Sequence, residues 1–331
     1  MSQDADPVGS GPTAAGMASL TPLAGGYSGE TFLVADGRTV VRIYAREPQR
    51  AVVDAALLRL VRGLVPVPAV LEVRPADAGR PGVLLTERLP GVRLEELLPR
   101  AGAAEWERLG IQLGRLLARL SGIPMPRPGT FADAELRIDR AELPDDLRDW
   151  VRGFRDNGRL AAWPAADHAA LLRLADDAAD RWPQPPCDRR SDPAPGHHPE
   201  QARCVLVHSD FNPKNILVDP ATLAVVGLLD WEFAHAGSPY TDLGNLLRFE
   251  RRPEFVAAVV AEFVDRAPPL APDPLLEARY ADLWALVELA GGGRPNAVRE
   301  LAAELLRAQA RAGDPTAWPW DTERATPKRA G

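Results

Sequence analysis

The stretch His208-Ser209-Asp210-Phe211-Asn212-Pro213-Lys214-Asn215 has the spacing His-x-Asp-x-x-x-x-Asn and lies between two short apolar runs. The runs 205–207 and 216–218 predict strands on either side of it. Asp230 follows at the end of a third apolar run, 223–229. The sequence therefore predicts two carboxylates and one amide placed by the ends of short strands.

Phosphoryl transfer requires residues of these types. A carboxylate accepts or orients the proton of an attacking hydroxyl, and oxygen ligands hold Mg²⁺ against a triphosphate. We assign Asp210 as the base, and Asn215 and Asp230 as the metal ligands. Taken singly, each Asp or Asn could belong to an ordinary turn, and His208 could be a packed residue at a strand end. The joint pattern predicts a catalytic loop.

The overall composition excludes several classes of protein. A formal net charge of −7 disfavours a nucleic-acid partner, because phosphate binding needs a basic face. Cys187 and Cys204 are too few for a disulfide scaffold and form no Cys-x-x-Cys metal pair. Residues 1–17 lack the regions of a secretory signal, and no apolar run approaches about 18 residues. We expect a cytoplasmic enzyme without a membrane partner, monomeric or homodimeric.

The length of 331 residues favours two lobes rather than one simple core. After a flexible N-terminus (1–18), residues 19–88 predict a small, mostly antiparallel sheet with one helix. The expected order is three strands, a helix over 48–62 and two further strands, with an Asp36-Gly37 turn in the first hairpin.

Residues 89–312 predict a larger, mostly helical lobe that begins at the turn Leu89-Pro90-Gly91. Residues 105–120 and 274–290 each read as one helix, because apolar residues recur at helical spacing. Residues 183–203 have no periodicity and predict an inserted mobile loop, and 313–331 form a tail. The expected fold class is α+β.

The segment from Val207 to Arg248 resembles the aminoglycoside phosphotransferase and choline kinase superfamily, a branch of the protein-kinase-like fold. The resemblance rests on the His-x-Asp-x-x-x-x-Asn motif, on Leu228-Leu229-Asp230-Trp231-Glu232 and on Tyr240-Thr241-Asp242-Leu243-Gly244-Asn245-Leu246. It implies a bilobal fold over about residues 19 to 290. It also implies that Asp210 is the base and that Asn215 and Asp230 bind the metal.

Two further residues are expected to support the catalytic loop. The resemblance implies that Asp242 braces this loop through hydrogen bonds to its backbone, together with His208. Independently of the resemblance, Asp242 follows Thr241 where a helix is expected to begin, so it could be a helix N-terminal cap. Trp231 occupies a position that is often aromatic in the superfamily.

The N-terminal lobe offers a set of expected nucleotide-binding residues. Gly25-Gly26-Tyr27-Ser28-Gly29 is not a Walker A loop, since no Gly-Lys-Ser/Thr follows. Between two strands it resembles the loop that covers the phosphates in kinases, although a simple tight hairpin is the alternative. By position in the last strand and linker, we assign the Glu87 carbonyl and the Leu89 N–H to the adenine base. The residues assigned to the nucleotide are Gly26, Ser28, Gly29, Arg42, Asp54, Glu87 and Leu89.

Arg42 departs from the kinase pattern, because it stands where the resemblance implies a phosphate-binding Lys. A guanidinium is planar and bidentate, so it is not equivalent to an ammonium. Asp54, in the helix that follows, stands where the partner is usually Glu. We hypothesise an Arg42–Asp54 ion pair, with an exposed strand position for Arg42 as the alternative.

The acceptor is expected to be a hydroxylated small molecule. Superfamily acceptors include aminoglycosides, other hydroxylated antibiotics, choline, homoserine and sugars. The preferred interpretation is an antibiotic O-phosphotransferase that uses ATP or GTP with Mg²⁺ and gives resistance. A metabolic kinase for an amino alcohol or sugar is the alternative, and a nucleotide-binding pseudokinase is the alternative of another class. Carboxylates that could contact the acceptor are Glu232, Asp282 and Glu288.

Overall fold

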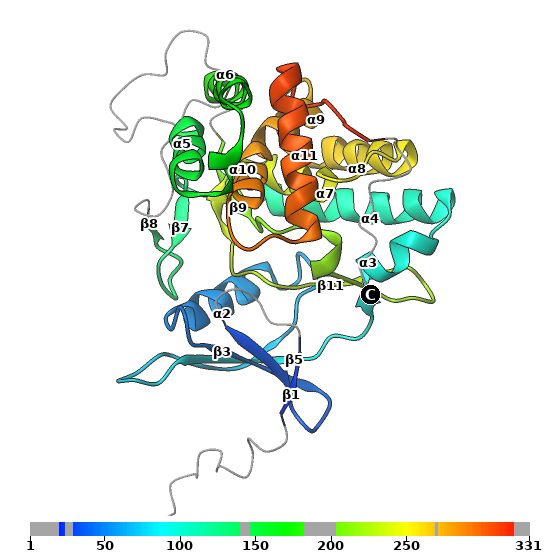
Figure 1. Ribbon diagram of the computed structural model, residues 1–331. Helices are drawn as coiled ribbons and strands as arrows, with labels where there is room; N and C mark the ends of the chain where they lie inside the picture. The colour runs from blue at the N-terminus through cyan, green and yellow to red at the C-terminus, as the bar shows by residue number, and fades with distance from the viewer. Residues whose placement is uncertain (1–19, 24–28, 140–145, 182–202, 269–270, 321–331) are drawn as a thin grey trace, which may run out of the picture. The chain divides into compact units, whose positions relative to one another are not determined.

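An antiparallel sheet of five strands, with one helix packed on it, forms the N-terminal unit of the chain (Figure 1). The computed structural model describes residues 20–23, 29–139, 146–181, 203–268 and 271–320. The sheet has the order β1-β2-β3-β5-β4. Its elements are β1 (Thr21–Pro22), β2 (Glu30–Leu33), β3 (Thr39–Tyr44), α2 (Arg50–Val61), β4 (Val70–Arg74) and β5 (Gly82–Glu87). The predicted order of three strands, one helix and two strands is confirmed.

The side chain of Asp36 closes the hairpin between β2 and β3. Its Oδ1 accepts hydrogen bonds from the N–H groups of Arg38 (2.8 Å) and Thr39 (2.9 Å), and its Oδ2 accepts one from Thr39 Oγ1 (2.7 Å). These bonds lower the pKa of Asp36, and the Thr39 hydroxyl is the largest cause. The Asp-Gly turn predicted from the sequence is therefore present, with Asp36 as its capping residue.

The division of the chain into two units departs from the predicted lobes at two places. Among the described residues, the first unit comprises those up to Arg62, Pro68–Leu89 and Asp133–Leu136, and the others belong to the second unit. Gly63–Val67 belongs to the second unit, where the Leu228 N–H donates to the Pro66 carbonyl at 2.7 Å. The predicted segments 1–18 and 183–202 lie outside the described residues.

Two small sheets in the second unit carry the catalytic motif. One has the order β8-β7-β12-β9 and the other the order β11-β10-β6. The motif at 208–215 leaves β9 of the first sheet and enters β10 of the second. The strands are β6 (Val92–Arg93), β7 (Gly129–Phe131), β8 (Ile138–Asp139), β9 (Val205–Val207), β10 (Ile216–Val218), β11 (Val225–Leu228) and β12 (His235–Gly237).

Helices make up most of the second unit, as predicted. They are α3 (Leu94–Leu97), α4 (Ala103–Ser121), α5 (Leu147–Asn157), α6 (Ala165–Arg181), α7 (Thr241–Leu247), α8 (Pro253–Arg266), α9 (Pro274–Ala281), α10 (Leu283–Gly291) and α11 (Ala297–Ala312). Helices α4 and α8 lie side by side (Figure 1), with the rings of Trp106 and Phe255 edge to face at 5.1 Å. None of the described helices is both long and apolar enough to cross a membrane.

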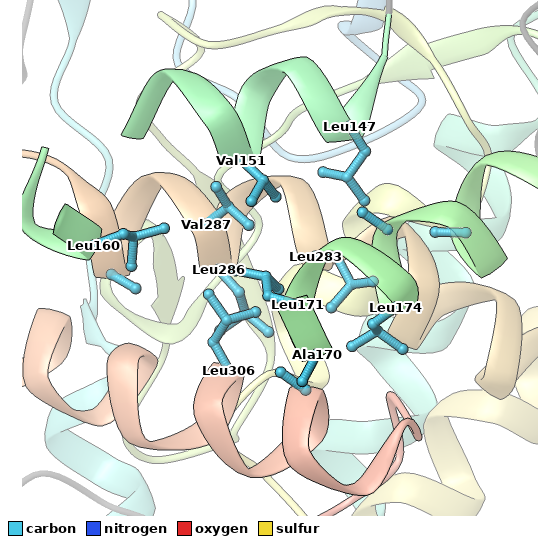
Figure 2. Packing of buried hydrophobic residues seen from close by; sticks show 14 of the residues in the cluster. Leu147, Val151, Leu160, Ala170, Leu171, Leu174, Leu283, Leu286, Val287 and Leu306 are labelled. Atoms are coloured by element: carbon cyan, nitrogen blue, oxygen red, sulfur yellow. The ribbon is translucent and has the colours of Figure 1, made fainter. Parts of the chain in front are cut away.

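A hydrophobic cluster joins four helices of this unit. Figure 2 shows Leu147 and Val151 of α5 and Leu171 of α6 directed toward α10, while Leu306 approaches from α11. Such a cluster buries the apolar stripes that the sequence pattern shows. It includes Leu147, Val151, Leu160, Ala170, Leu171, Leu174, Leu283, Leu286, Val287 and Leu306.

The predicted single helix over 274–290 is wrong, because the structure has two helices that meet at Asp282. The carboxylate of Asp282 is buried at 3% exposure and forms an ion pair with Arg248. Apolar periodicity does not detect this break, since the spacing of apolar residues continues through it.

Candidate active site

The carboxylate of Asp210 is held by three side chains of its own loop. Oδ1 accepts a hydrogen bond from Asn212 Nδ2 at 2.5 Å, and Oδ2 accepts one from Asn215 Nδ2 at 2.8 Å. Lys214 Nζ lies 2.9 Å from Oδ2. Ser209, which precedes Asp210, has a left-handed φ of 67°. For a residue other than glycine this conformation is uncommon and is often found at functional sites. The loop therefore fixes the orientation of the carboxylate.

The side-chain NH₂ group of Asn215 donates its hydrogen bonds to Asp210. Its Nδ2 donates to the Asp210 carbonyl (3.0 Å) as well as to Oδ2, so its Oδ1 is turned the other way. A hard oxygen of this kind suits Mg²⁺, which usually takes one or two protein ligands besides phosphates and water. Among the described residues no group of three or more His, Cys, Asp or Glu could hold a metal. The donor types present fit magnesium.

His208 connects Asp210 to the segment that carries Asp230. The His208 Nε2 lies 2.9 Å from the Leu229 carbonyl, and its Nδ1 accepts from the Asp210 N–H at 3.3 Å. These contacts assign the Nε2–H tautomer. The Leu229 N–H donates to the Asn215 carbonyl at 2.8 Å. Leu229 is therefore bonded to both parts of the catalytic loop, and Asp230 follows it directly, with a left-handed φ of 66°.

Asp242 holds the backbone of the same loop. Its Oδ2 accepts from the His208 N–H and its Oδ1 from the Ser209 N–H, both at 2.8 Å. The brace implied by the resemblance is therefore present. The alternative of a helix cap is wrong, because α7 follows Tyr240, which makes no side-chain cap bond, and Asp242 lies within the helix. Burial raises the pKa of Asp242 to about 7, and the charge of Asp210 also raises it. The hydrogen bonds from the two backbone N–H groups lower this pKa, but their effect is smaller than that of burial.

The ring of Trp231 packs against His208. Its ring is 2% exposed and meets the imidazole edge to face at 4.7 Å, while its Nε1 donates to the Leu228 carbonyl at 3.2 Å. Burial lowers the pKa of His208 to about 4, against opposing contributions from Asp210 and the Leu229 carbonyl. His208 is therefore neutral at neutral pH, as its two hydrogen bonds require.

This burial predicts a pH-dependent contribution of His208 to stability. Its pKa is about 4 when folded and ordinarily 6.5, so the stabilisation is complete above pH 6.5 and is lost as pH falls toward 4. We expect the free-energy difference of unfolding between wild type and His208→Gln to shrink by roughly 2 kcal/mol from pH 7 to pH 5. Denaturant unfolding at both pH values measures it, and parallel pH curves for the two proteins would contradict it.

The expected nucleotide-binding residues are only partly described. Gly26 and Ser28 lie outside the described residues. Gly29 is buried, and a Cβ on it would lie 2.3 Å from the Ile43 carbonyl oxygen, so sheet packing alone requires glycine there. A role of Gly29 in nucleotide binding stays a prediction.

At the end of β5, Glu87 bonds to Ala69 through both its backbone and its side chain. The Glu87 N–H donates to the Ala69 carbonyl (3.0 Å), and the Ala69 N–H donates to Glu87 Oε1 (2.9 Å). In a strand the carbonyl points the same way as the N–H of its residue. The side chain thus takes a donor that would otherwise satisfy the Glu87 carbonyl. This arrangement suits the predicted adenine contact at Glu87, and the contact at Leu89 stays a prediction.

The predicted Arg42–Asp54 ion pair is wrong. Asp54 Oδ1 accepts from Arg50 Nε, and its Oδ2 accepts from the Tyr44 hydroxyl, both at 2.6 Å. Arg50 lies four residues before Asp54 on α2, where side chains are neighbours, and this cation takes the carboxylate. The guanidinium of Arg42 lies 5.2 Å from the centre of the Tyr44 ring, and Arg42 is half-buried rather than exposed.

The three acidic candidates for acceptor binding have different environments. Asp282 is buried and bonded to Arg248 through both carboxylate oxygens at 2.7–3.1 Å, so the prediction that it contacts the acceptor is wrong. Glu232 is also buried, at 7% exposure. Glu288 on α10 is exposed, yet partial desolvation raises its pKa, against the charges of Arg299 and Arg248, and the charge of Asp210 also raises it. Glu288 therefore lies within electrostatic reach of Asp210.

Sequence reasoning gave no role to Asn212 and Lys214, although both stand inside the quoted motif. Lys214 follows Asp210 by four residues, and Asn212 accepts the Lys214 N–H at 3.2 Å, which starts the 3₁₀ turn Pro213–Asn215. The spacing could have indicated a contact, because residues four apart approach each other in a helical turn.

Comparisons with known proteins identify relatives of this chain. A model of the phosphotransferase enzyme family matches residues 19–272. Aminoglycoside 3'-phosphotransferase of Streptomyces fradiae is 26% identical over 238 residues, which are 68% of this chain and 76% of that protein. Acyl-CoA dehydrogenase family member 10 of Mus musculus is 25% identical over 182 residues. That match covers 54% of this chain and only 15% of the mouse protein.

Solved structures share the fold. A Ralstonia eutropha protein assigned as an aminoglycoside phosphotransferase superposes with a TM-score of 0.62 at 17% identity, over 89% of this chain and 91% of that one. ADP-bound aminoglycoside phosphotransferase APH(2'')-Ib gives 0.55 at 15% identity, over 90% and 93%. An APH(4)-Ia variant in complex with ADP and hygromycin B gives 0.56 at 17% identity, over 89% and 92%. At such identities the likeness shows the bilobal kinase-like fold alone.

The family match spans more than half of the chain, and the hydrogen-bonded motif at 208–215 lies inside the matched region. The enzymes of this family transfer phosphate to a hydroxyl group. The chain therefore belongs to the phosphotransferase enzyme family.

Proposed function

We propose that the protein is a Mg²⁺-dependent O-phosphotransferase that moves the γ-phosphate of ATP or GTP to a hydroxyl of an antibiotic and so gives resistance. One observation carries the proposal. The Asp210 carboxylate is oriented by Asn212, Lys214 and Asn215, in a loop that Leu229 joins to Asp230. This is the arrangement that in-line phosphoryl transfer requires, since the chemistry depends on position and charge.

Asp210 acts on the acceptor hydroxyl. As the hydroxyl oxygen bonds to the γ-phosphorus, its proton passes to the carboxylate of Asp210. The bond between the γ-phosphorus and the bridging oxygen breaks, and its electron pair leaves with the nucleoside diphosphate. Mg²⁺, held by Asn215 Oδ1 and the Asp230 carboxylate, would neutralise charge on the phosphates.

The nucleotide donor is supported by the fold and by its relatives. ADP is bound in two of the structures with the same fold. The side chain of Glu87 satisfies the Ala69 N–H and leaves the Glu87 carbonyl for a base. Contacts to backbone groups at this position do not discriminate ATP from GTP by themselves.

The acceptor class follows from charge near the base. Glu288 is exposed, and its pKa responds to the charges of Arg299 and Arg248 and, less strongly, to that of Asp210. The carboxylates of Glu288 and Asp210 are the groups that would attract a cationic acceptor. The Streptomyces fradiae relative carries the name aminoglycoside 3'-phosphotransferase, and the APH(4)-Ia complex contains hygromycin B. Both observations favour an aminoglycoside over a neutral hydroxylated antibiotic, such as a nucleoside type.

A metabolic acceptor is the second candidate. The chain also matches part of a mouse protein that is named for another activity. A panel of aminoglycosides, nucleoside antibiotics, choline, homoserine and sugars, with labelled ATP and GTP, separates the two. We expect transfer to an aminoglycoside. Transfer to choline, homoserine or a sugar alone would contradict the antibiotic assignment, and nucleotide binding without any product would favour a pseudokinase.

Glu288→Gln tests the acceptor side of the site. We expect the KM for a cationic acceptor to rise roughly tenfold, because one charge-assisted contact is lost, while the KM for the nucleotide is unchanged. Glu107→Gln, at an exposed position on α4, is the matched control and should leave both constants unchanged. Equal acceptor KM values in the Glu288→Gln variant and the wild type would contradict the assignment of Glu288 to the acceptor site.

A further inference from the structure

The ammonium of Lys214 contacts the carboxylate of Asp210, the proposed base. Its Nζ lies 2.9 Å from Asp210 Oδ2, and its side chain is 49% exposed, against 16% for Asp210. The other donors to this carboxylate are amides of Asn212, which is half-buried, and of Asn215, which is buried. Lys214 is therefore the donor with the most freedom to move.

The identity of the residue is informative because this chain uses arginine almost everywhere else. Lys214 and Lys328 are the only lysines among its 39 basic residues. Guanidinium groups form other ion pairs of the described residues, for example Arg50–Asp54 and Arg248–Asp282. An ammonium is a compact point charge with rotatable donors, whereas a guanidinium would clamp a carboxylate through a planar fork.

A carboxylate oxygen has two lone pairs, so an oxygen that already accepts from two donors can take up a proton only when one of them leaves. Asp210 Oδ2 already accepts from Asn215 Nδ2 and from Lys214, and Oδ1 accepts from Asn212. When the hydroxyl proton arrives, the carboxylate becomes neutral and its attraction for the ammonium falls. At the same moment negative charge is spread over the equatorial oxygens of the transferring phosphoryl group.

We propose that Lys214 is a further catalytic residue, whose ammonium leaves Asp210 for the transferring phosphoryl group as the acceptor proton reaches Asp210 Oδ2. This proposal rests on the proposed function of Asp210. The acceptor oxygen–phosphorus bond forms, the bond to the bridging oxygen breaks, and the electron pair leaves on the nucleoside diphosphate. The ammonium keeps its three protons and contributes charge alone, as a preorganised electrostatic group does.

The kinetic test compares Lys214→Met and Lys214→Arg with the wild type. We expect Lys214→Met to lower kcat about 10²- to 10³-fold, the loss typical of one transition-state donor. Lys214→Arg should recover less than one-tenth of the wild-type kcat, because its fork stays on Asp210. Lys328→Met is the matched control and should match the wild type. Near-wild-type kcat in Lys214→Arg would overturn the proposal, since any cation would then serve to orient Asp210.

A second measurement needs no acceptor. Acetylation of amines with a water-soluble succinimidyl ester, read by mass spectrometry, reports on Lys214 and Lys328 separately. The ammonium can pass to the transferring group only if the bound γ-phosphate lies beside Lys214 before transfer. We therefore expect Mg²⁺ and a non-hydrolysable ATP analogue to slow modification of Lys214 and to leave that of Lys328 unchanged. Equal rates at Lys214 with and without nucleotide would overturn the proposal, even if the variants fold poorly.

The two measurements also separate this proposal from the proposed function. A wild-type protein that transfers phosphate, with Lys214→Met within threefold of its kcat, overturns the assignment of Lys214 alone. A wild-type protein that neither transfers phosphate nor hydrolyses nucleotide overturns the proposed function, and the role of Lys214 with it.

Discussion

Asp210→Asn is expected to lower kcat by about 10²- to 10⁴-fold, the range for loss of a general base. The carboxamide has nearly the same shape, but it cannot take up the acceptor proton. Its NH₂ group would also face the donor of Asn212 or of Asn215, which now meet Asp210 at 2.5 and 2.8 Å. Binding of the nucleotide should persist, because the proposed magnesium ligands Asn215 and Asp230 remain.

Steady-state kinetics and nucleotide titration measure these two effects separately. Asp219→Asn makes the same chemical change nearby, where the carboxylate accepts from the N–H groups of Ala221 and Thr222 at 2.9 Å and also bonds to the Thr222 side chain. That control should keep full activity, since an asparagine oxygen also caps such a turn. If the Asp210→Asn variant kept more than one-tenth of the activity, the assignment of Asp210 as the base would be wrong.

Asp282→Asn is expected to lower the free energy of unfolding by about 3–5 kcal/mol, the usual cost of breaking a buried ion pair. Arg248 is 7% exposed and would lose a charged partner that bonds it at 2.7 Å. Arg279, whose pKa burial lowers to about 9, is also supported by the charge of Asp282. One carboxylate thus compensates more than one buried guanidinium.

Chemical denaturation measures this loss, and Asp265→Asn is the matched control. Asp265 is 75% exposed and lies 4.0 Å from Arg266, so its replacement should change stability by less than about 0.5 kcal/mol. An Asp282→Asn variant of normal stability with a raised KM for the acceptor would support the contact that the sequence suggested instead.

The sequence located most elements because their signals are local. Alternation and the Asp-Gly turn predicted β2, β3 and the hairpin between them, and the apolar stripe predicted α4. The strands β6, β7, β8 and β12 had no such signal, because none of them is a run of apolar residues. These strands form because they pair with segments that are distant in the sequence, and a local sequence pattern does not predict such pairing.

The errors at the site share one physical cause, which is the choice of partner for a charge. A sequence shows that Asp54 and Asp282 are acidic, but not which arginine reaches them. Arg50 takes Asp54 because both lie on one turn of α2, and Arg248 takes Asp282 across two helices. The motif around Asp210 could be predicted as a unit, because the side chains that bond to Asp210 lie within five residues of it along the chain.

The central claim is that Asp210, Asn215 and Asp230 serve one phosphoryl-transfer reaction. The most direct test is a crystal structure of the protein with Mg²⁺, a non-hydrolysable ATP analogue and an acceptor aminoglycoside. The account predicts that Asn215 Oδ1 and an Asp230 oxygen bind the same ion at about 2.0–2.1 Å, and that Asp210 faces an acceptor hydroxyl. A magnesium ion that either ligand does not touch, or a hydroxyl out of reach of Asp210, would contradict it.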